Sequence, residues 1–182
     1  EEQVLRVITQ FVNPRYRFVC LVSAYSGLRL KNVVHLKRIE VNLKDGWLNI
    51  KSQSKTGKPV SIPIGPGLRK VFKLFKVWPL RDEDRFFPTV KAKPISVQVG
   101  KAFKKAGISW GSFHHFRHFA ACELINNGVP LEVVREFLGH SDIKSTLVYA
   151  RLKGEKLQEA VSGFDTTLTQ IEGQQFDWAI SD

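Results

Sequence analysis

The sequence lacks methionine altogether, has only two cysteines and contains no long hydrophobic run. No stretch approaches the ~18 apolar residues that a membrane-spanning helix needs, and no signal-peptide pattern opens the chain. We therefore expect a cytoplasmic protein with no membrane partner. The lack of methionine suggests a fragment of a longer protein or a processed form.

The few cysteines give no sign of a metal site. Cys20 and Cys122 both lie in apolar helical patterns, where we expect buried, reduced thiols. No combination of cysteine and histidine matches the spacing of a zinc site, so no metal ligands are expected.

Acidic residues are scarce: 17 Asp and Glu against 28 Lys and Arg give a net charge of +11. Four of the acidic residues, and no Lys or Arg, lie in residues 162–182, so removing this charge of −4 leaves +15 on residues 1–161. A strongly basic globular body indicates a polyanionic partner, with DNA as the obvious candidate. A basic surface that only keeps the protein soluble explains the charge equally well.

The chain does contain enough apolar material for one core, since 43% of its 182 residues are hydrophobic and 13 are Phe. Apolar residues recur with the helical period over much of the sequence. Pro14 suits the first turn of a helix, and Gly27, Gly107 and Asn127-Gly128 are typical helix ends. We expect helices over residues 4–12, 18–25, 30–37, 68–75, 97–106, 116–126, 130–138, 141–149 and 155–161.

A different pattern, with apolar residues at alternate positions, occupies residues 39–43, 47–50 and 60–64. Asp45-Gly46 is a turn dipeptide between the first two runs, and residues 52–58 form a polar turn before the third. These signals predict a three-stranded antiparallel meander. The expected fold class is therefore α+β, mainly helical with a small three-stranded antiparallel sheet.

Six polar residues, in order over 120 positions, form a candidate catalytic set. Fixed cations can neutralise the charge that develops on a phosphodiester, and a phenol can supply the attacking oxygen. The set therefore has the composition that phosphoryl transfer through a tyrosine requires. Its members are Arg29, Lys55, His114, Arg117, His140 and Tyr149.

Each member alone has an ordinary explanation. Lys55 is a typical solvated turn lysine, His140 a typical cap or turn residue, and Tyr149 a typical half-buried helix tyrosine. Arg117 lies among apolar helical residues, where a guanidinium needs an anionic partner. That partner is either a carboxylate inside the protein or a bound phosphate.

Three histidines surround Arg117. His114 lies three residues before it, so both side chains can point to one face of a helix. We expect His118 to face the core as a hydrogen-bonded structural residue. His115 is assigned to the surface or to a supporting position beside the site.

Taken together, the motifs around these six residues resemble those of the tyrosine recombinases, the family of phage integrases and chromosome-dimer resolution recombinases. The resemblance covers about residues 1–161. It is carried by Ser26-Gly27-Leu28-Arg29, Ser54-Lys55-Thr56-Gly57, His114-His115-Phe116-Arg117-His118, Leu138-Gly139-His140-Ser141 and Tyr149.

The resemblance implies a site-specific DNA recombinase that cleaves and rejoins strands through a 3′-phosphotyrosyl intermediate, with no cofactor. Tyr149 would be the nucleophile, and Arg29 and Arg117 would clamp the non-bridging phosphate oxygens. His114 and His140 would hydrogen-bond the phosphate or handle the tyrosine proton. Lys55 would be the general acid for the leaving 5′-oxygen.

The family's organisation implies further expectations. Residues 1–161 would be a catalytic domain, without the N-terminal DNA-clamping domain that the family usually has. Four copies would act on two DNA duplexes, in a prokaryotic nucleoid or encoded by a phage or mobile element. The acidic tail, residues 162–182, would dock on a neighbouring protomer or fold on its own domain. The alternatives are a type IB-like topoisomerase, or a non-catalytic DNA-binding protein with the same fold.

Overall fold

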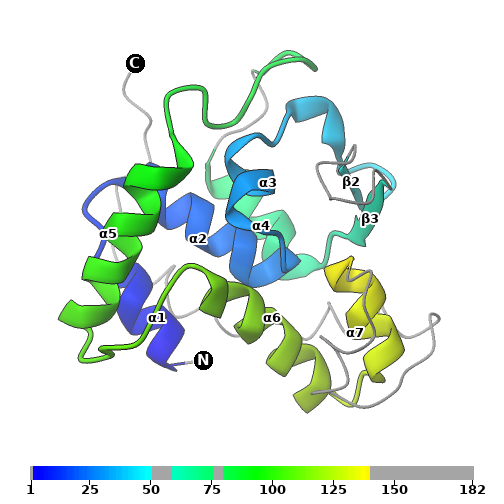
Figure 1. Cartoon of the computed structure of the whole chain (residues 1–182). Coiled ribbons are helices and arrows are strands. Elements are labelled where there is room, and N and C mark those ends of the chain that lie inside the picture. Colours follow the sequence, from blue (N-terminus) through cyan, green and yellow to red (C-terminus); the bar gives the residue numbers. More distant parts are fainter. Residues whose placement is uncertain (1, 51–58, 76–79, 140–182) are drawn as a thin grey trace.

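The computed structural model describes residues 2–50, 59–75 and 80–139 and is mainly helical, with one small sheet beside the helices (Figure 1). The helices are α1 (Glu2–Thr9), α2 (Pro14–Ser26), α3 (Leu30–Val34), η1 (Arg38–Glu40, a 3-10 turn), α4 (Pro66–Leu74), α5 (Ala92–Lys105), α6 (His114–Asn126) and α7 (Leu131–Leu138). The strands are β1 (Val41–Asn42), β2 (Trp47–Ile50) and β3 (Val60–Pro63). The predicted fold class is confirmed. None of the described helices is long and apolar enough to span a membrane.

The sheet is the antiparallel meander that the alternating pattern predicts, in the order β1-β2-β3. Leu48 pairs with Val41 on one side and with Ile62 on the other. The turn between β1 and β2 contains Gly46 with a φ of 75°, a value that favours glycine. Ile50 pairs with Val60, so the segment 51–58, which lies outside the described residues, begins and ends at neighbouring strands.

Helix α2 lies at the centre of the molecule and packs against α1, α3, α4 and α6. It starts at Pro14, four residues before the predicted range, with Pro14 in the first turn as expected and the Asn13 side chain accepting a hydrogen bond from the Arg15 amide at 2.9 Å. All its residues from Phe18 onward are buried, because neighbours cover it on every side. It ends at Gly27, whose φ of 65° is the left-handed conformation of a helix C-cap.

Phenylalanines fill the core between α2, α4 and the segment before α5. Phe18 stacks on Phe75 with ring centroids 3.9 Å apart and contacts the edge of Phe72 at 6.0 Å. Phe86 and Phe87 close the cluster from the connecting segment, which is held by the hydrogen bond from Phe86 N to Leu36 O at 3.1 Å. Burying each of these side chains stabilises the folded state by about 1.5–3 kcal/mol, which offsets the cost of burying the charged site described below.

Several boundaries differ from the sequence prediction. Helix α5 begins at Ala92 rather than at residue 97, and α6 begins at His114 rather than at 116. Cys20 is buried as expected, but Cys122 is exposed, so the prediction of a buried thiol at Cys122 was wrong. The helices expected at 141–149 and 155–161 lie outside the described residues.

Gly27 is the glycine on which the packing of α7 depends. A Cβ at Gly27 would lie 2.7 Å from Leu138 Cδ2 and 2.9 Å from Phe137 Cε1, whereas a Cβ at Gly128 would meet nothing within 4 Å. Both glycines have positive φ values, 65° and 74°. The two positions therefore share the backbone strain of a substitution and differ in the clash.

We predict that Gly128→Ala lowers the free energy of unfolding by about 1–2 kcal/mol, the cost of a left-handed residue with a Cβ. Gly27→Ala should cost about 1–3 kcal/mol more, because Leu138 and Phe137 must move. Urea unfolding of both variants measures the difference. Equal destabilisation would show that α7 is not pressed against Gly27.

Candidate active site

Arg117 is a buried charge that joins two helix ends. It lies on the inner face of α6 with only 3% of its surface exposed. Its Nη1 donates to Gly27 O at 2.6 Å and its Nη2 donates to Leu138 O at 2.5 Å. These carbonyls are at the C-terminal ends of α2 and α7, where carbonyls lack partners within the helix and the helix dipole is negative. The guanidinium therefore ties the Gly27-Leu28-Arg29 turn to the end of the helix that precedes His140.

No carboxylate of the described residues pairs with Arg117, although sequence reasoning allowed an internal ion pair as one explanation. Of its five N–H donors, two are used on the carbonyls. The buried Nε has no hydrogen-bond partner in this part of the chain. A buried guanidinium with unused donors and no counter-charge is suited to bind an anion.

Two serines hold Arg29 in place next to this charge. Ser23 Oγ donates to Leu28 O at 2.8 Å, and the Leu28 amide donates to Ser26 Oγ at 3.3 Å. Both serines and Leu28 are buried, so the turn is fixed from below. Arg29 follows as the exposed N-cap residue of α3, and its side chain makes no capping hydrogen bond with that helix.

The charges of this cluster act on one another. Burial, followed by the charge of Arg29, lowers the pKa of Arg117 to about 9. Burial lowers the pKa of His114 as well, and the charges of His118, Arg117, Arg29 and His115 lower it further. The structure therefore brings Arg29, His114 and Arg117 together. A neutral His114 can accept as well as donate a hydrogen bond, while Arg117, with a pKa of about 9, remains cationic near neutral pH.

The neighbouring histidines are placed differently from one another. His118 is exposed, so the prediction that it faces the core was wrong, and its ring lies edge to face with His114 at 4.5 Å. His115 is half-buried, and its Nδ1 accepts a hydrogen bond from the Ser112 amide at 2.9 Å. This contact fixes the loop before α6, which agrees with a supporting position for His115.

Lys55, His140 and Tyr149 lie outside the described residues, so the structure brings together only half of the candidate set. It does describe residues that lie close in sequence to two of them, His140 and Lys55. Gly139, directly before His140, packs so closely on β3 that a Cβ there would lie 2.9 Å from Val60 Cγ2. Val60 in turn pairs with Ile50 at the base of the segment that contains Lys55.

Sequence reasoning missed the groups that hold the site in shape. The carbonyls of Gly27 and Leu138 carry no side-chain signal, since a backbone acceptor looks the same at every position. Of the two serines, only Ser26 is part of the motif around Gly27, and the part of both in fixing the turn depends on hydrogen bonds with the Leu28 backbone. A buried serine directly before a helix-ending glycine is the signal that could have found it.

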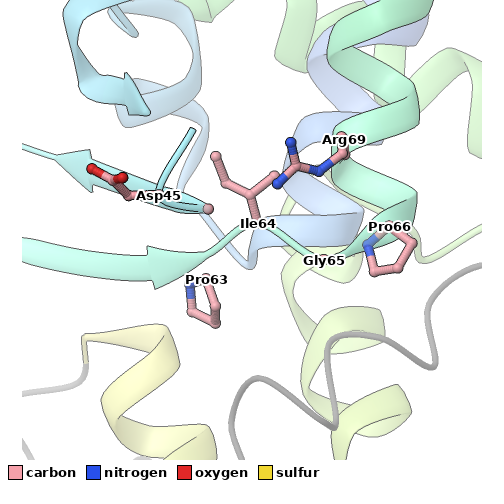
Figure 2. A pocket seen from close by; sticks show the side chains of 7 residues that line it. Asp45, Pro63, Ile64, Gly65, Pro66 and Arg69 are labelled. Atoms are coloured by element: carbon pink, nitrogen blue, oxygen red, sulfur yellow. The ribbon is translucent and has the colours of Figure 1, made fainter. Parts of the chain in front are cut away.

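A separate hollow of about 360 Å³ lies between the β1–β2 turn and the start of α4 and shares no residue with the candidate set. Figure 2 shows Arg69 reaching from α4 toward this turn, where its Nη1 donates to Leu43 O at 2.8 Å. The contact attaches the sheet to α4. The hollow is lined by Asp45, Gly46, Pro63, Ile64, Gly65, Pro66 and Arg69.

Over residues 2–50, 59–75 and 80–139, no group of three or more His, Cys, Asp or Glu side chains could hold a metal ion.

The family model described as the phage integrase family matches residues 1–156, most of the chain. The chain belongs to the phage integrase family. This agrees with the resemblance seen in the motifs, and the architecture described above is that of a tyrosine recombinase catalytic domain.

Curated and structural relatives of this integrase-family chain agree with one another. The tyrosine recombinase XerA of Pyrococcus furiosus is 29% identical over 184 residues, which cover 96% of this chain and 64% of the relative. The integrase of mycobacterium phage Brujita has a TM-score of 0.69 at 21% identity, over 93% of this chain and 61% of that one. A lambda integrase dimer bound to a COC′ core site has a TM-score of 0.65 at 20% identity, over 85% of this chain and 59% of the integrase chain. This integrase-family chain thus spans less than two thirds of the length of each of these relatives.

We predict that the cluster makes the domain less stable in mild acid. The folded-state pKa of His114 is below its ordinary value of 6.5, so below about pH 6.5 the unfolded chain binds more protons than the folded one. The free energy of unfolding should therefore fall as the pH drops from 7 to 5. His114→Gln should flatten this slope, and Arg29→Gln should flatten it partly, because it removes one of the charges that lower the pKa.

Urea titrations at several pH values measure these slopes. Identical slopes in the wild-type protein and in His114→Gln would contradict the coupling.

Proposed function

We propose that this chain is the DNA strand-cleaving and rejoining domain of a site-specific tyrosine recombinase. The observation that carries the proposal is the cluster of Arg29, His114 and Arg117, where a buried guanidinium has unused donors and no carboxylate partner among the described residues. Such a site has affinity for a phosphodiester. Membership of the phage integrase family supports the same reaction.

In the proposed reaction, the phenolic oxygen of Tyr149 attacks the scissile phosphorus and loses its proton. The bond from phosphorus to the 5′-oxygen breaks, and Lys55 gives a proton to the leaving oxygen. The products are a 3′-phosphotyrosyl bond and a free 5′-hydroxyl. A 5′-hydroxyl from another strand reverses these steps, and the energy of the phosphodiester bond is retained throughout, so no cofactor is needed.

The described residues would supply charge stabilisation. Donors of Arg117 that are not used on Gly27 and Leu138 would bind one non-bridging oxygen, and Arg29 would bind another from the exposed side. His114 would donate to the phosphate or exchange a proton with the phenol, and His140 would do the same. Because Arg117 is already fixed by two carbonyls, its charge needs no reorganisation when negative charge develops on the phosphate.

Duplex DNA is the proposed partner. The charge of +15 on residues 1–161 would bind the DNA backbone, and the similar lambda integrase is a dimer bound to a core site. We further propose that four copies act on two DNA sites. The acidic residues 162–182 would dock on a neighbouring copy, since their charge opposes DNA binding.

We predict that Tyr149→Phe abolishes covalent attachment to a nicked suicide substrate while leaving DNA affinity within about twofold, because only the nucleophilic oxygen is lost. Tyr16→Phe is the matched control, since it removes the phenol oxygen of a half-buried tyrosine in α2, and it should still form the adduct. Denaturing gels measure the adduct. An adduct that persists in Tyr149→Phe would reject the nucleophile. Relaxation of supercoiled DNA by single copies, without recombinant products, would favour a topoisomerase.

We predict that deleting residues 163–182 leaves adduct formation on a half-site but prevents assembly on two sites. If the tail docks on a neighbour, the melting temperature at low protein concentration should remain within about 2 °C of that of the full chain. A fall of several degrees, the loss expected for ~1–2 kcal/mol, would show that the tail folds on its own domain.

A further inference from the structure

Trp110 is an exposed indole that the proposed reaction leaves unused. It lies in the connection between α5 and α6 with 66% of its surface exposed. Every other Phe, Tyr or Trp side chain of the described residues is buried or half-buried. A single exposed apolar residue is common on protein surfaces, so the exposure alone assigns no role.

The indole is held firmly in its exposed position. Ile108 and Phe113 anchor the two sides of the connection in the core, and a Cβ at Gly111 would collide with the ring of Phe103. The ring of Trp110 rests on His115 with centroids 4.9 Å apart. Because the connection is packed down on both sides of the indole, a ligand that meets Trp110 does not have to order it first.

A row of aromatic rings connects Trp110 to the cation cluster, which consists of Arg29, His114 and Arg117. The centroid of His115 is 4.9 Å from that of Trp110 and 5.9 Å from that of His118, and His118 is 4.5 Å from His114. The charges of Arg117 and Arg29 in turn lower the pKa of His114. At ~3.4 Å per nucleotide of one strand, the indole lies within about five nucleotides of a phosphate bound at His114.

We propose that Trp110 is a stacking platform for an unpaired base of the cleaved strand. The inference rests on the proposed strand cleavage, which frees a 5′-end next to the cation cluster. In an intact duplex both faces of every base are covered by neighbouring bases, so an indole outside the helix cannot stack on one. Once the strand is cut, a base near the end can leave its stack, and the exposed ring offers it a surface.

The test compares single-stranded and duplex DNA. A short single-stranded oligonucleotide should quench part of the tryptophan fluorescence of the wild-type protein. In Trp110→Ala this part of the quenching should be lost, and binding should weaken about 5- to 150-fold, the span for one base on one aromatic ring. Trp110→Phe should retain most of the affinity. Binding of an uncut duplex should remain within about twofold in all of these variants.

Trp47→Phe is the matched control, because Trp47 is a half-buried indole of β2 outside the row of rings. It should lower the total fluorescence and leave both the oligonucleotide affinity and the Trp110 quenching in place. Val97→Ala controls for the loss of an exposed apolar side chain, since Val97 is 54% exposed on α5. Melting temperatures of all variants identify any that fail to fold. If Trp110→Ala fails to fold, Trp110→Phe still tests the platform through the quenching, because the part that comes from a base on Trp110 must be absent from this variant; equal quenching in Trp110→Phe and the wild-type protein overturns the proposal.

The outcomes separate this inference from the proposed cleavage. Unchanged single-strand binding in Trp110→Ala overturns the platform, and so does an equal loss on duplex, which would indicate a contact with the backbone or sugars of uncut DNA. Normal single-strand binding with loss of two-site assembly overturns it in favour of a protein contact. Adduct formation on the suicide substrate is measured in the same proteins. Its absence in the wild-type protein would reject the cleavage while the single-strand measurement still decides the stacking.

Discussion

The hydrogen bonds of one buried guanidinium determine the shape of the site. Arg117 donates to Gly27 O and to Leu138 O, which are 90 and 21 residues away in sequence. Each carbonyl belongs to a helix end and lacks a partner within its helix. One side chain therefore satisfies the ends of α2 and α7 at once and places α6 between them (Figure 1).

Carbonyls suit this position better than a carboxylate would. A carboxylate bonded to Arg117 would cancel its charge, and a bound phosphodiester would then meet a neutral pair. Two helix C-termini carry only about half a negative charge each, so they orient the guanidinium while its charge remains available for a ligand. Burying the cation costs stability, as the lowered pKa of Arg117 shows, and the packed phenylalanines around α2 offset that cost.

Local signals predicted much of the fold. The turn at Asp45-Gly46, the end of α2 at Gly27 and the order of the helices follow from short-range rules on glycine, proline and hydrophobic periodicity. The start of α6 was missed because its N-cap is Phe113, in helical backbone geometry and without a side-chain cap, so no capping residue marks it. The start of α5 was missed for a similar reason, since Lys91 makes no capping hydrogen bond either.

Half of the candidate site lies in the described part of the chain, and there the sequence proposed the residues but did not reveal their surroundings. Periodicity could have corrected His118, which with His114 lies opposite the buried positions Phe116, Ala120 and Leu124 on α6. Periodicity alone could not reveal why Arg117 is tolerated among the buried residues. Its acceptors are backbone atoms brought close only by the tertiary fold, and no residue type encodes them.

The same links extend from the described residues toward the rest of the candidate set. Arg117 donates a hydrogen bond to Leu138 O. Gly139, which follows Leu138, packs on Val60, and Val60 pairs with Ile50. These contacts join the turn before Arg29, the residue before His140 and both ends of the segment that holds Lys55. Glycine is required at Gly139, because its φ of 60° and its contact with Val60 leave no room for a side chain. A change at any one of these contacts therefore acts on described residues that are distant in sequence but adjacent in the fold.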